Sequence, residues 1–503
     1  MSANEKMPSK GEVKTARAAQ QRQAERRSNI MYAVIGVAFL LVAVSVFVWR
    51  SNIIQKSATA MSVSNGNTYN TAETSYYFNN IYQNFVSQNG SYLSYMGLDT
   101  SAPLREQSYG DETWFDFFLE QTQSQMAVID ALNDAAAADG FTWTADLQAQ
   151  LDETMNTVTS MATSRGFGNV SKYLQQIYGP TMSVSTYKEQ LQRTMLAEAY
   201  SKQYADSLQY SDAELTAAYE ADPNRGDGVD YESVRISGAA PTTDADGNTV
   251  EVTDEMTANA MAAAKETATN IIREYRKGGD LSKLAEDNDG TYNSMENGSY
   301  SDSALQNWLF DSSRKAGDAA VVEDQDGSAY YVAVFHDRQR RDYDLINVRH
   351  ILIQPETGEK TADEEGYAKE QAQLKADAEK KAADLLSQWQ AGEATEDSFA
   401  ALAEENSSDP GSASNGGLYE DVAPGDMVQP FNDWCFDSSR KPGDTGIVET
   451  DYGYHVMYYV GTDMPYWKLQ ARNSLFNEDY QEWYTGITDG YTAEAQSGMK
   501  YIG

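Results

Sequence analysis

The spacing of hydrophobic residues changes character twice along the chain. Residues 30–49 form one continuous apolar run without a charged side chain. Residues 74–222 repeat apolar side chains every three or four positions, the spacing of amphipathic helices, as at Leu147, Leu151, Met155 and Val158. Farther along, short strand-like runs alternate with helical segments. The pattern therefore predicts an apolar segment, a helical domain and a C-terminal part of the α+β class.

The apolar run has the properties of a membrane anchor. Its twenty residues span about 30 Å as a helix, which matches the hydrocarbon core of a bilayer. Basic residues dominate residues 1–29, so the positive-inside rule places this tail in the cytoplasm. A cleaved signal peptide is the alternative, since Ala58-Thr59-Ala60 resembles a cleavage site, but its apolar core would hold only about 7–15 residues. We expect an uncleaved single-pass transmembrane helix over 30–49, with the bulk of the chain extracytoplasmic at the cell membrane.

A polar segment separates the apolar run from the helical domain. Residues 50–73 are rich in Ser, Asn and Thr, and we interpret them as a spacer from the membrane. Within 74–222, residues 111–113 and 211–214 have the composition of helix N-caps ahead of helical runs. The aromatic stripe that includes Tyr77 and Phe78 fits either a helical core or a partly exposed groove for unfolded chains.

An internal repeat is the most informative feature of the C-terminal half. The segment LQNWLFDSSRKAGDAAVVEDQDGSAYYVAVF at residues 305–335 matches FNDWCFDSSRKPGDTGIVETDYGYHVMYYVG at residues 431–461, at a fixed offset of 126. Upstream, Val234-Arg235 corresponds to Val348-Arg349. A period of this length corresponds to a whole domain. The sequence thus predicts two tandem α+β domains, at 229–340 and 345–461, followed by a helical segment at 462–503.

Charge and the rare residue types exclude several functions. The formal net charge is −38, which repels phosphate backbones and makes nucleic-acid binding unexpected. Either a solvated exterior or attraction of basic clients fits this charge. The single cysteine, Cys435, excludes an intramolecular disulfide and a cysteine-based zinc cluster, and its apolar neighbours favour a buried hydrophobe over a nucleophile. Zinc-protease, hydrolase-elbow and P-loop motifs do not occur, and no cofactor or metal is expected.

Four separated blocks of the second repeat resemble the parvulin-type (PpiC, rotamase) peptidyl-prolyl cis–trans isomerases. They are VRHILI at 348–353, FAALAEENSSDPGSASNGG at 399–417, MVQPFNDWCF at 427–436 and TDYGYH at 450–455. The whole layout resembles membrane-anchored foldases of the PrsA type and periplasmic chaperones of the SurA type. In both, a helical chaperone region is split in sequence around the parvulin domains. The resemblance implies that the C-terminal segment 462–503 returns to the helical domain.

The resemblance also implies a site. It assigns four residues to the catalytic centre: His350, Asp409, Thr450 and His455. It assigns four others to an apolar pocket for the proline ring: Leu418, Met427, Phe431 and Phe436. The paired histidines can either take part in the chemistry or hold the shape of the site. The Arg/Lys cluster of phospho-specific parvulins is missing after the first strand, so phosphoserine recognition is not expected.

The first repeat lacks the residues of this site. Aligning the two repeats by their sequences places Ile236, Asp324 and Ala329 at the positions equivalent to His350, Thr450 and His455. We therefore expect the domain at 229–340 to be an inactive copy, kept for packing or for contact with clients.

The function expected from these features is that of a membrane-anchored extracytoplasmic prolyl isomerase and chaperone. Its expected partners are unfolded or partly folded secreted proteins with Xaa-Pro bonds, together with the membrane. The alternative is a non-catalytic holdase chaperone that uses its parvulin folds only as binding surfaces. An isomerisation assay on a proline peptide separates the two.

Overall fold

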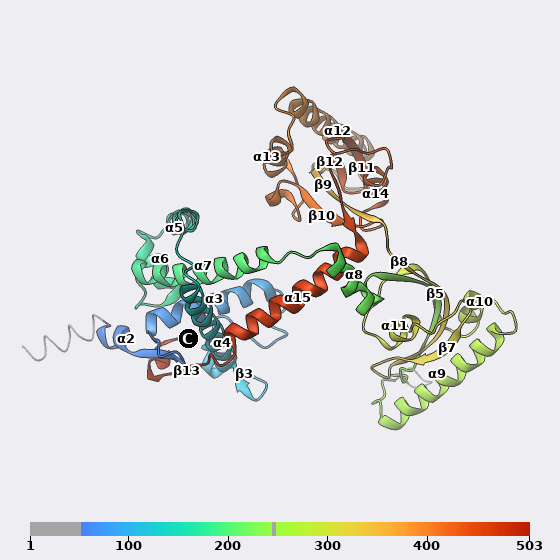
Figure 1. The fold of residues 1–503 in the computed structure, drawn as a ribbon, viewed down its shortest axis with the longest axis horizontal. Coiled ribbons are helices and arrows are strands. Elements are labelled where there is room, and N and C mark those ends of the chain that lie inside the picture. Colours follow the sequence, from blue (N-terminus) through green and yellow to red (C-terminus); the bar gives the residue numbers. More distant parts are fainter. Residues whose placement is uncertain (1–51, 244–247) are drawn as a thin grey trace, which may run out of the picture. The chain divides into compact units, whose positions relative to one another are not determined.

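The structure, a computed structural model, describes residues 52–243 and 248–503 (Figure 1). The predicted cytoplasmic tail at 1–29 and the predicted membrane helix at 30–49 lie outside the described residues. Within 52–243 and 248–503, no helix combines the length and the apolar character that crossing a bilayer requires. Contacts divide the chain into two units. One consists of the described residues up to Leu208 together with Asp479–Gly503, and the other is Gln209–Glu478.

The first unit is mainly helical. Several of its helices are capped at the N-terminus by the side chain of the preceding residue. Asn70 forms a capping box with Glu73, and Thr113 forms one with Asp116. Its helices are α2 (Ile53–Ser57), α3 (Thr71–Asn89), α4 (Trp114–Ala138), α5 (Ala145–Ser164), α6 (Val170–Tyr178) and α7 (Val184–Ser207). Its strands are β1 (Thr59–Val63), β2 (Thr68–Asn70), the hairpin of β3 (Ser108–Tyr109) and β4 (Glu112–Thr113), and β13 (Ala493–Ala495).

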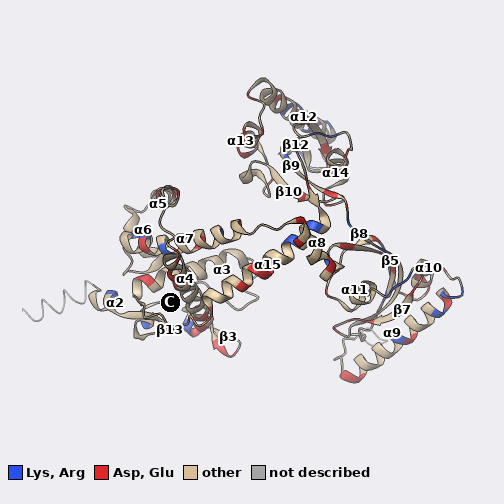
Figure 2. Cartoon of the chain, in the orientation of Figure 1, with Lys and Arg blue, Asp and Glu red and all other residues tan. Residues whose placement is uncertain are grey.

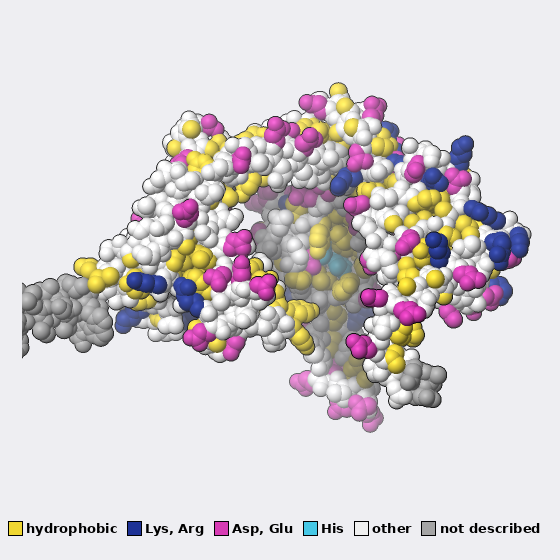
Figure 3. All heavy atoms as spheres, turned by 90° about the horizontal axis from the view of Figure 1, so that it is seen from below, with side chains coloured by type: hydrophobic (Ala, Val, Ile, Leu, Met, Phe, Trp, Pro, Cys, Tyr) yellow, Lys and Arg dark blue, Asp and Glu magenta, His cyan; other side chains and the backbone are white. Residues whose placement is uncertain are grey.

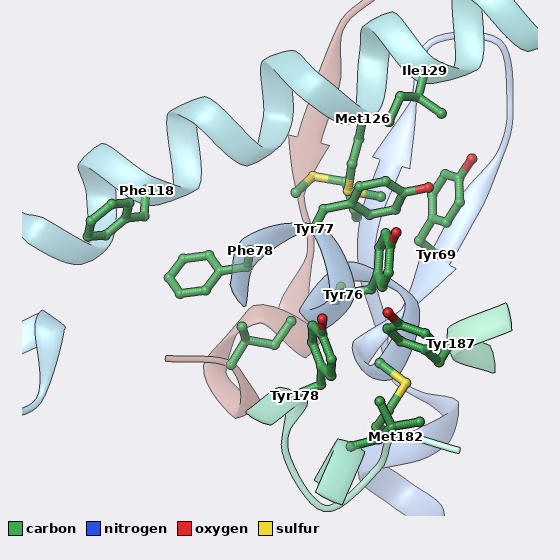
Figure 4. Packing of buried hydrophobic residues seen from close by; sticks show 14 of the residues in the cluster. Tyr69, Tyr76, Tyr77, Phe78, Phe118, Met126, Ile129, Tyr178, Met182 and Tyr187 are labelled. Atoms are coloured by element: carbon green, nitrogen blue, oxygen red, sulfur yellow. The ribbon is translucent and has the colours of Figure 1, made fainter. Parts of the chain in front are cut away.

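The core of this unit is aromatic. Tyr76 and Tyr77 of α3 lie edge to face, and Tyr76 also stacks on Tyr178 of α6 (Figure 4). In the same unit, the buried carboxylate of Asp130 accepts a hydrogen bond from Arg193 at 2.5 Å. The aromatic stripe seen in the sequence is therefore largely the helical core, the first of the two interpretations that the pattern left open.

The interpretation of residues 50–73 as a spacer is wrong. Strand β1 is the central strand of a three-stranded sheet in the order β13-β1-β2, and Ala60 and Met61 are fully buried. Met61 pairs with Ala495, more than 400 residues away in the sequence. Because the partner strand is so distant, the local Ser/Asn/Thr-rich composition gave no sign of it.

The second unit holds two α+β copies with one topology, as the repeat predicts. Each has a four-stranded antiparallel sheet, in the orders β6-β5-β8-β7 and β10-β9-β12-β11. The elements of the first copy are β5 (Asp227–Ser237), α9 (Asp254–Tyr275), α10 (Leu281–Glu286), β6 (Thr291–Gly298), α11 (Ala304–Leu309), β7 (Ala319–Glu323) and β8 (Ala329–Arg340). Those of the second copy are β9 (Asp344–Ile353), α12 (Tyr367–Ala391), α13 (Glu396–Asn406), β10 (Leu418–Val422), α14 (Gln429–Cys435), β11 (Thr445–Thr450) and β12 (Gly453–Pro465).

The boundary of the helical domain at residue 222 is also corrected. Helix α8 (Asp212–Ala221) belongs to the second unit, where the Tyr219 hydroxyl donates to Asp227 at 2.6 Å. Helix α15 (Tyr466–Thr488) begins in the second unit and, from Asp479 onward, belongs to the first. There Trp483 stacks on Tyr204 with ring centroids 4.2 Å apart. An amphipathic pattern shows that a helix has a buried face, but it does not show which core that face contacts.

Acidic side chains are spread over both units and are not gathered at one place (Figure 2). On the face drawn in Figure 3 they lie scattered among polar and hydrophobic side chains. This distribution is that of a solvated exterior.

Candidate active site

The central strands of the second copy bring its two histidines together. His350 of β9 pairs with Met457 of β12, and His455 lies two residues before Met457 on the same strand. Because side chains alternate between the faces of a sheet, both imidazoles point to one face. They are 3% and 5% exposed, and their Nδ1 atoms are 3.0 Å apart. The predicted pairing of His350 with His455 is present.

Asp409 and Thr450 lie at opposite ends of this pair. Asp409 Oδ2 is 3.1 Å from His350 Nε2, and Thr450 Oγ1 is 2.8 Å from His455 Nε2. The structure thus brings all four predicted catalytic residues into one continuous hydrogen-bonded chain.

The direction of this chain follows from its charge states. Burial lowers the pKa of His350, with Asp409 opposing the change. Burial and the neighbouring His350 lower the pKa of His455 to about 4. Both imidazoles are therefore neutral near pH 7, and each has one donor nitrogen and one acceptor nitrogen.

An ionised carboxylate can only accept hydrogen bonds. His350 must therefore donate from Nε2 to Asp409, which leaves its Nδ1 as an acceptor. His455 then donates from Nδ1, and its Nε2 accepts the hydroxyl proton of Thr450. Every proton of the chain points toward Asp409.

The loop between α13 and β10 holds Asp409 in place. Gly417 in this loop has φ +72°, and a Cβ there would lie 2.2 Å from the His350 carbonyl oxygen. The close approach lets the His350 amide donate to the Gly417 carbonyl at 2.9 Å. Arg349, which points to the opposite face, donates to the carbonyls of Asn415 and Gly416. The Asn-Gly-Gly sequence therefore fixes the loop against β9.

Two residues that the sequence did not assign to the site bind Asp409. Ser412 donates to its Oδ2 at 2.5 Å, and the Tyr419 hydroxyl donates to the same oxygen at 2.9 Å. Burial alone would raise the pKa of Asp409, but these two hydrogen bonds and the nearby His350 hold it below its usual 3.8. The sequence feature that points to Ser412 as a partner of Asp409 is its position three residues later, in the tight turn Asp-Pro-Gly-Ser.

Three of the four predicted pocket residues contribute to an apolar wall beside the histidines. Phe431 is buried, and its ring lies edge to face with both imidazoles at 5.4 Å. Met427 and Phe436 pack in the same cluster. Cys435 is buried there too, and burial raises its pKa to about 12, which agrees with a hydrophobic rather than a nucleophilic role.

The assignment of Leu418 to the pocket is wrong, and Tyr419 takes that place. Leu418 pairs with Arg349, whereas Tyr419 pairs with Val348 on the face that carries His350. Tyr419 packs in the apolar cluster and stacks on His350, with ring centroids 5.4 Å apart. The departure from the family pattern at Leu418-Tyr419 hid this one-residue shift, and a shift of one residue moves a side chain to the other face.

A hollow of about 840 Å³ adjoins the site at Thr450. Val428, Pro430 and Tyr452 give it an apolar wall. Its charged lining consists of Glu449 and Asp451, with Lys375 paired to Glu449. This lining has no excess of positive charge with which to bind a phosphate.

The structure changes which residue of the first copy corresponds to His350. Tyr331 is the repeat equivalent of Met457, and it pairs with Arg235, not with Ile236. Ile236 instead packs in the core that includes α9 residues. Arg235 is thus the counterpart of His350, and the assignment of Ile236 is corrected by one residue.

The first copy also lacks the loop that carries Asp409. Only residues 287–290 connect α10 to β6, whereas residues 407–417 connect α13 to β10. With Ala329 at the position of His455, the hydrogen-bonded chain of the second copy has no counterpart here.

The second copy also matches a known protein family. A protein-family profile described as a PPIC-type PPIASE domain matches residues 330–460. The chain thus carries a parvulin-type peptidyl-prolyl isomerase domain, and it is similar to chaperones and foldases of the SurA and PrsA type. It is similar to Chaperone SurA of Pseudomonas syringae pathovar tomato, with 25% identity over 361 residues, covering 67% of this chain and 76% of that protein. It is also similar to Foldase protein PrsA 1 of Listeria innocua, with 33% identity over 116 residues, covering 23% of this chain and 30% of that protein.

Among solved structures, PrsA from Bacillus subtilis aligns with 75% of this chain and 88% of its own, at 14% identity and a TM-score of 0.24. A peptidylprolyl isomerase (PrsA) from Bacillus anthracis aligns with 32% of this chain and 60% of its own, at 20% identity and a TM-score of 0.19.

Proposed function

We propose that this foldase isomerises Xaa-Pro bonds of unfolded or partly folded secreted proteins at the site of its second α+β copy. The observation that supports the proposal is the chain from Thr450 through both histidines to Asp409, beside the wall formed by Phe431. The first copy serves packing or client contact.

The chemistry asked of this site is modest. Prolyl isomerisation breaks no covalent bond and takes about 10–100 s without a catalyst at 25 °C. A thousandfold acceleration requires about 4 kcal/mol of preferential binding of the twisted bond. A dry apolar wall for the proline ring and a fixed set of hydrogen bonds can supply this. The neutral histidines add no charge beside the wall, and the proposed reaction requires no proton transfer from them.

The second part of the proposal is the location. We infer that residues 30–49 anchor the chain in the cell membrane, with residues 52–503, here called the ectodomain, on the extracytoplasmic side. The support is the uninterrupted apolar run and the basic residues that precede it. Sequencing of the mature protein from membranes tests this. An N-terminus at Met61 would contradict it, because cleavage after Ala60 would remove the proposed anchor at residues 30–49. Such a cleavage would also remove the first two residues of strand β1.

A tetrapeptide isomerisation assay on the ectodomain tests the activity. The proposal predicts acceleration of the cis-to-trans step at catalytic concentrations of protein. The alternative, a holdase chaperone that uses its parvulin folds only as binding surfaces, predicts suppression of aggregation with no acceleration of the peptide.

A further inference from the structure

Tyr419 occupies two environments at once. Its ring belongs to the apolar wall with Phe431 and Met427, and it stacks on the His350 imidazole at an interplanar angle of 24°. Its hydroxyl donates to Asp409 at 2.9 Å. A side chain placed in this way links the proline-binding wall to the carboxylate that ends the histidine chain.

The hydrogen bonds on Asp409 are strongly one-sided. His350, Ser412 and Tyr419 all bind the same oxygen, Oδ2, at 3.1, 2.5 and 2.9 Å. Among the hydrogen bonds found in the described residues, Oδ1 takes part in none. With Oδ2 held by three donors, the carboxylate is fixed in rotation, and Oδ1 keeps its lone pairs for water or for a bound peptide.

We propose that Tyr419 is a positioning residue of the isomerase: its hydroxyl holds the Asp409 carboxylate in the orientation that the histidine chain needs, while its ring forms part of the proline wall. The inference rests on the function proposed above. Burial and the hydrogen bond to Asp409 raise the pKa of Tyr419, so the phenol stays protonated and remains a donor.

The two parts of Tyr419 predict different kinetic effects. Tyr419→Phe keeps the ring but removes the donor, so kcat should fall at least about tenfold, the usual effect of losing one hydrogen bond to a charged group, while KM stays within about twofold. Tyr419→Leu removes the ring as well and should also raise KM. Tyr458→Phe is the matched control, because Tyr458 lies in the cluster on the opposite face, with Trp389 and Phe399.

A double-mutant cycle with Asp409→Ala tests whether Tyr419 acts through Asp409. The proposal predicts that Tyr419→Phe has its full effect on kcat when Asp409 is present and less than a twofold effect when it is absent. An equal loss in both backgrounds would overturn it, as would an unchanged kcat for Tyr419→Phe or an equal loss for Tyr458→Phe.

A spectroscopic signature gives the same test without relying on activity. The ectodomain has three histidines, so in the His336→Gln variant the only histidine ¹⁵N signals are those of the His350–His455 pair. Tyr419→Phe should shift the His350 Nε2 signal when Asp409 is present but not in the Asp409→Ala background. Ser412→Ala, which removes another donor to the same oxygen, should shift it in the same way. If the wild type failed to isomerise the peptide, the proposed function would fall, while these signals would still decide the role of Tyr419.

Discussion

Acid should destabilise the second copy through its buried histidine pair before the carboxylates are neutralised. His455 is 5% exposed, and burial together with His350 lowers its pKa from 6.5 to about 4. In the unfolded chain the same side chain takes up a proton near pH 6.5. Between these two values unfolding therefore takes up protons, so the folded state loses stability as the pH falls and regains it as the pH rises.

The size of the effect follows from the two pKa values. One unit of difference corresponds to about 1.4 kcal/mol, so His455 alone contributes about 3 kcal/mol over the whole window and about 2 kcal/mol between pH 7 and pH 5. No reduction for solvent screening is needed, because the imidazole is buried. Burial lowers the pKa of His350 as well, which adds to the effect in the same direction.

Urea unfolding of the ectodomain at pH 7 and pH 5 measures the loss, with His455→Gln as the comparison. The many carboxylates of the chain titrate in both proteins, so only the difference between their pH dependences is informative. We expect the wild type to lose about 2 kcal/mol more than the variant over this interval. Equal losses would refute the reasoning, as would ¹⁵N signals that show His455 taking up its proton near pH 6.5.

Three further predictions concern the wall, the hollow and the corrected spacer. Phe431→Ala and Met427→Ala should cut peptide isomerisation more than they reduce suppression of aggregation by the folded ectodomain; a parallel loss would mean that one surface serves both activities. A peptide with phosphoserine before proline should be isomerised more slowly than its serine counterpart, because Glu449 and Asp451 line the hollow; equal or faster turnover would contradict this. Met61→Ala should lower the free energy of unfolding of the first unit by about 2–5 kcal/mol, the cost of truncating a buried methionine, and a change below 1 kcal/mol would restore the spacer interpretation.

The repeat carried most of the information that the sequence offered about the fold. A match at a constant offset of 126 fixed both α+β copies, and the four blocks of the second copy located His350 and His455. What local pattern could not provide was contact between distant segments. Strand β1 pairs with β13 at the other end of the chain, and neither segment is distinctive by itself.

The errors in the site have one physical cause. A one-residue change of register in a strand reverses which face a side chain occupies. Sequence comparison therefore named Leu418 where Tyr419 faces the histidines, and Ile236 where Arg235 is the counterpart of His350. The turn and the glycines of the loop at 407–417 made Asp409 identifiable as a site residue from the sequence. The two residues that donate to its carboxylate, Ser412 and Tyr419, became clear only from the geometry.

The central claim is that prolyl isomerisation occurs in the second copy and not in the first. The repeat supplies a matched pair for testing it, because Phe431 and Leu305 occupy the same position in the two copies. Isomerisation of an Xaa-Pro tetrapeptide should be measured for the folded ectodomain with Phe431→Ala and, separately, with Leu305→Ala. We predict that Phe431→Ala lowers kcat/KM at least about tenfold, as expected for a lost transition-state contact of about 1.4 kcal/mol or more, and that Leu305→Ala leaves kcat/KM within about twofold of wild type. Equal losses in the two variants, or a loss confined to Leu305→Ala, would contradict the account.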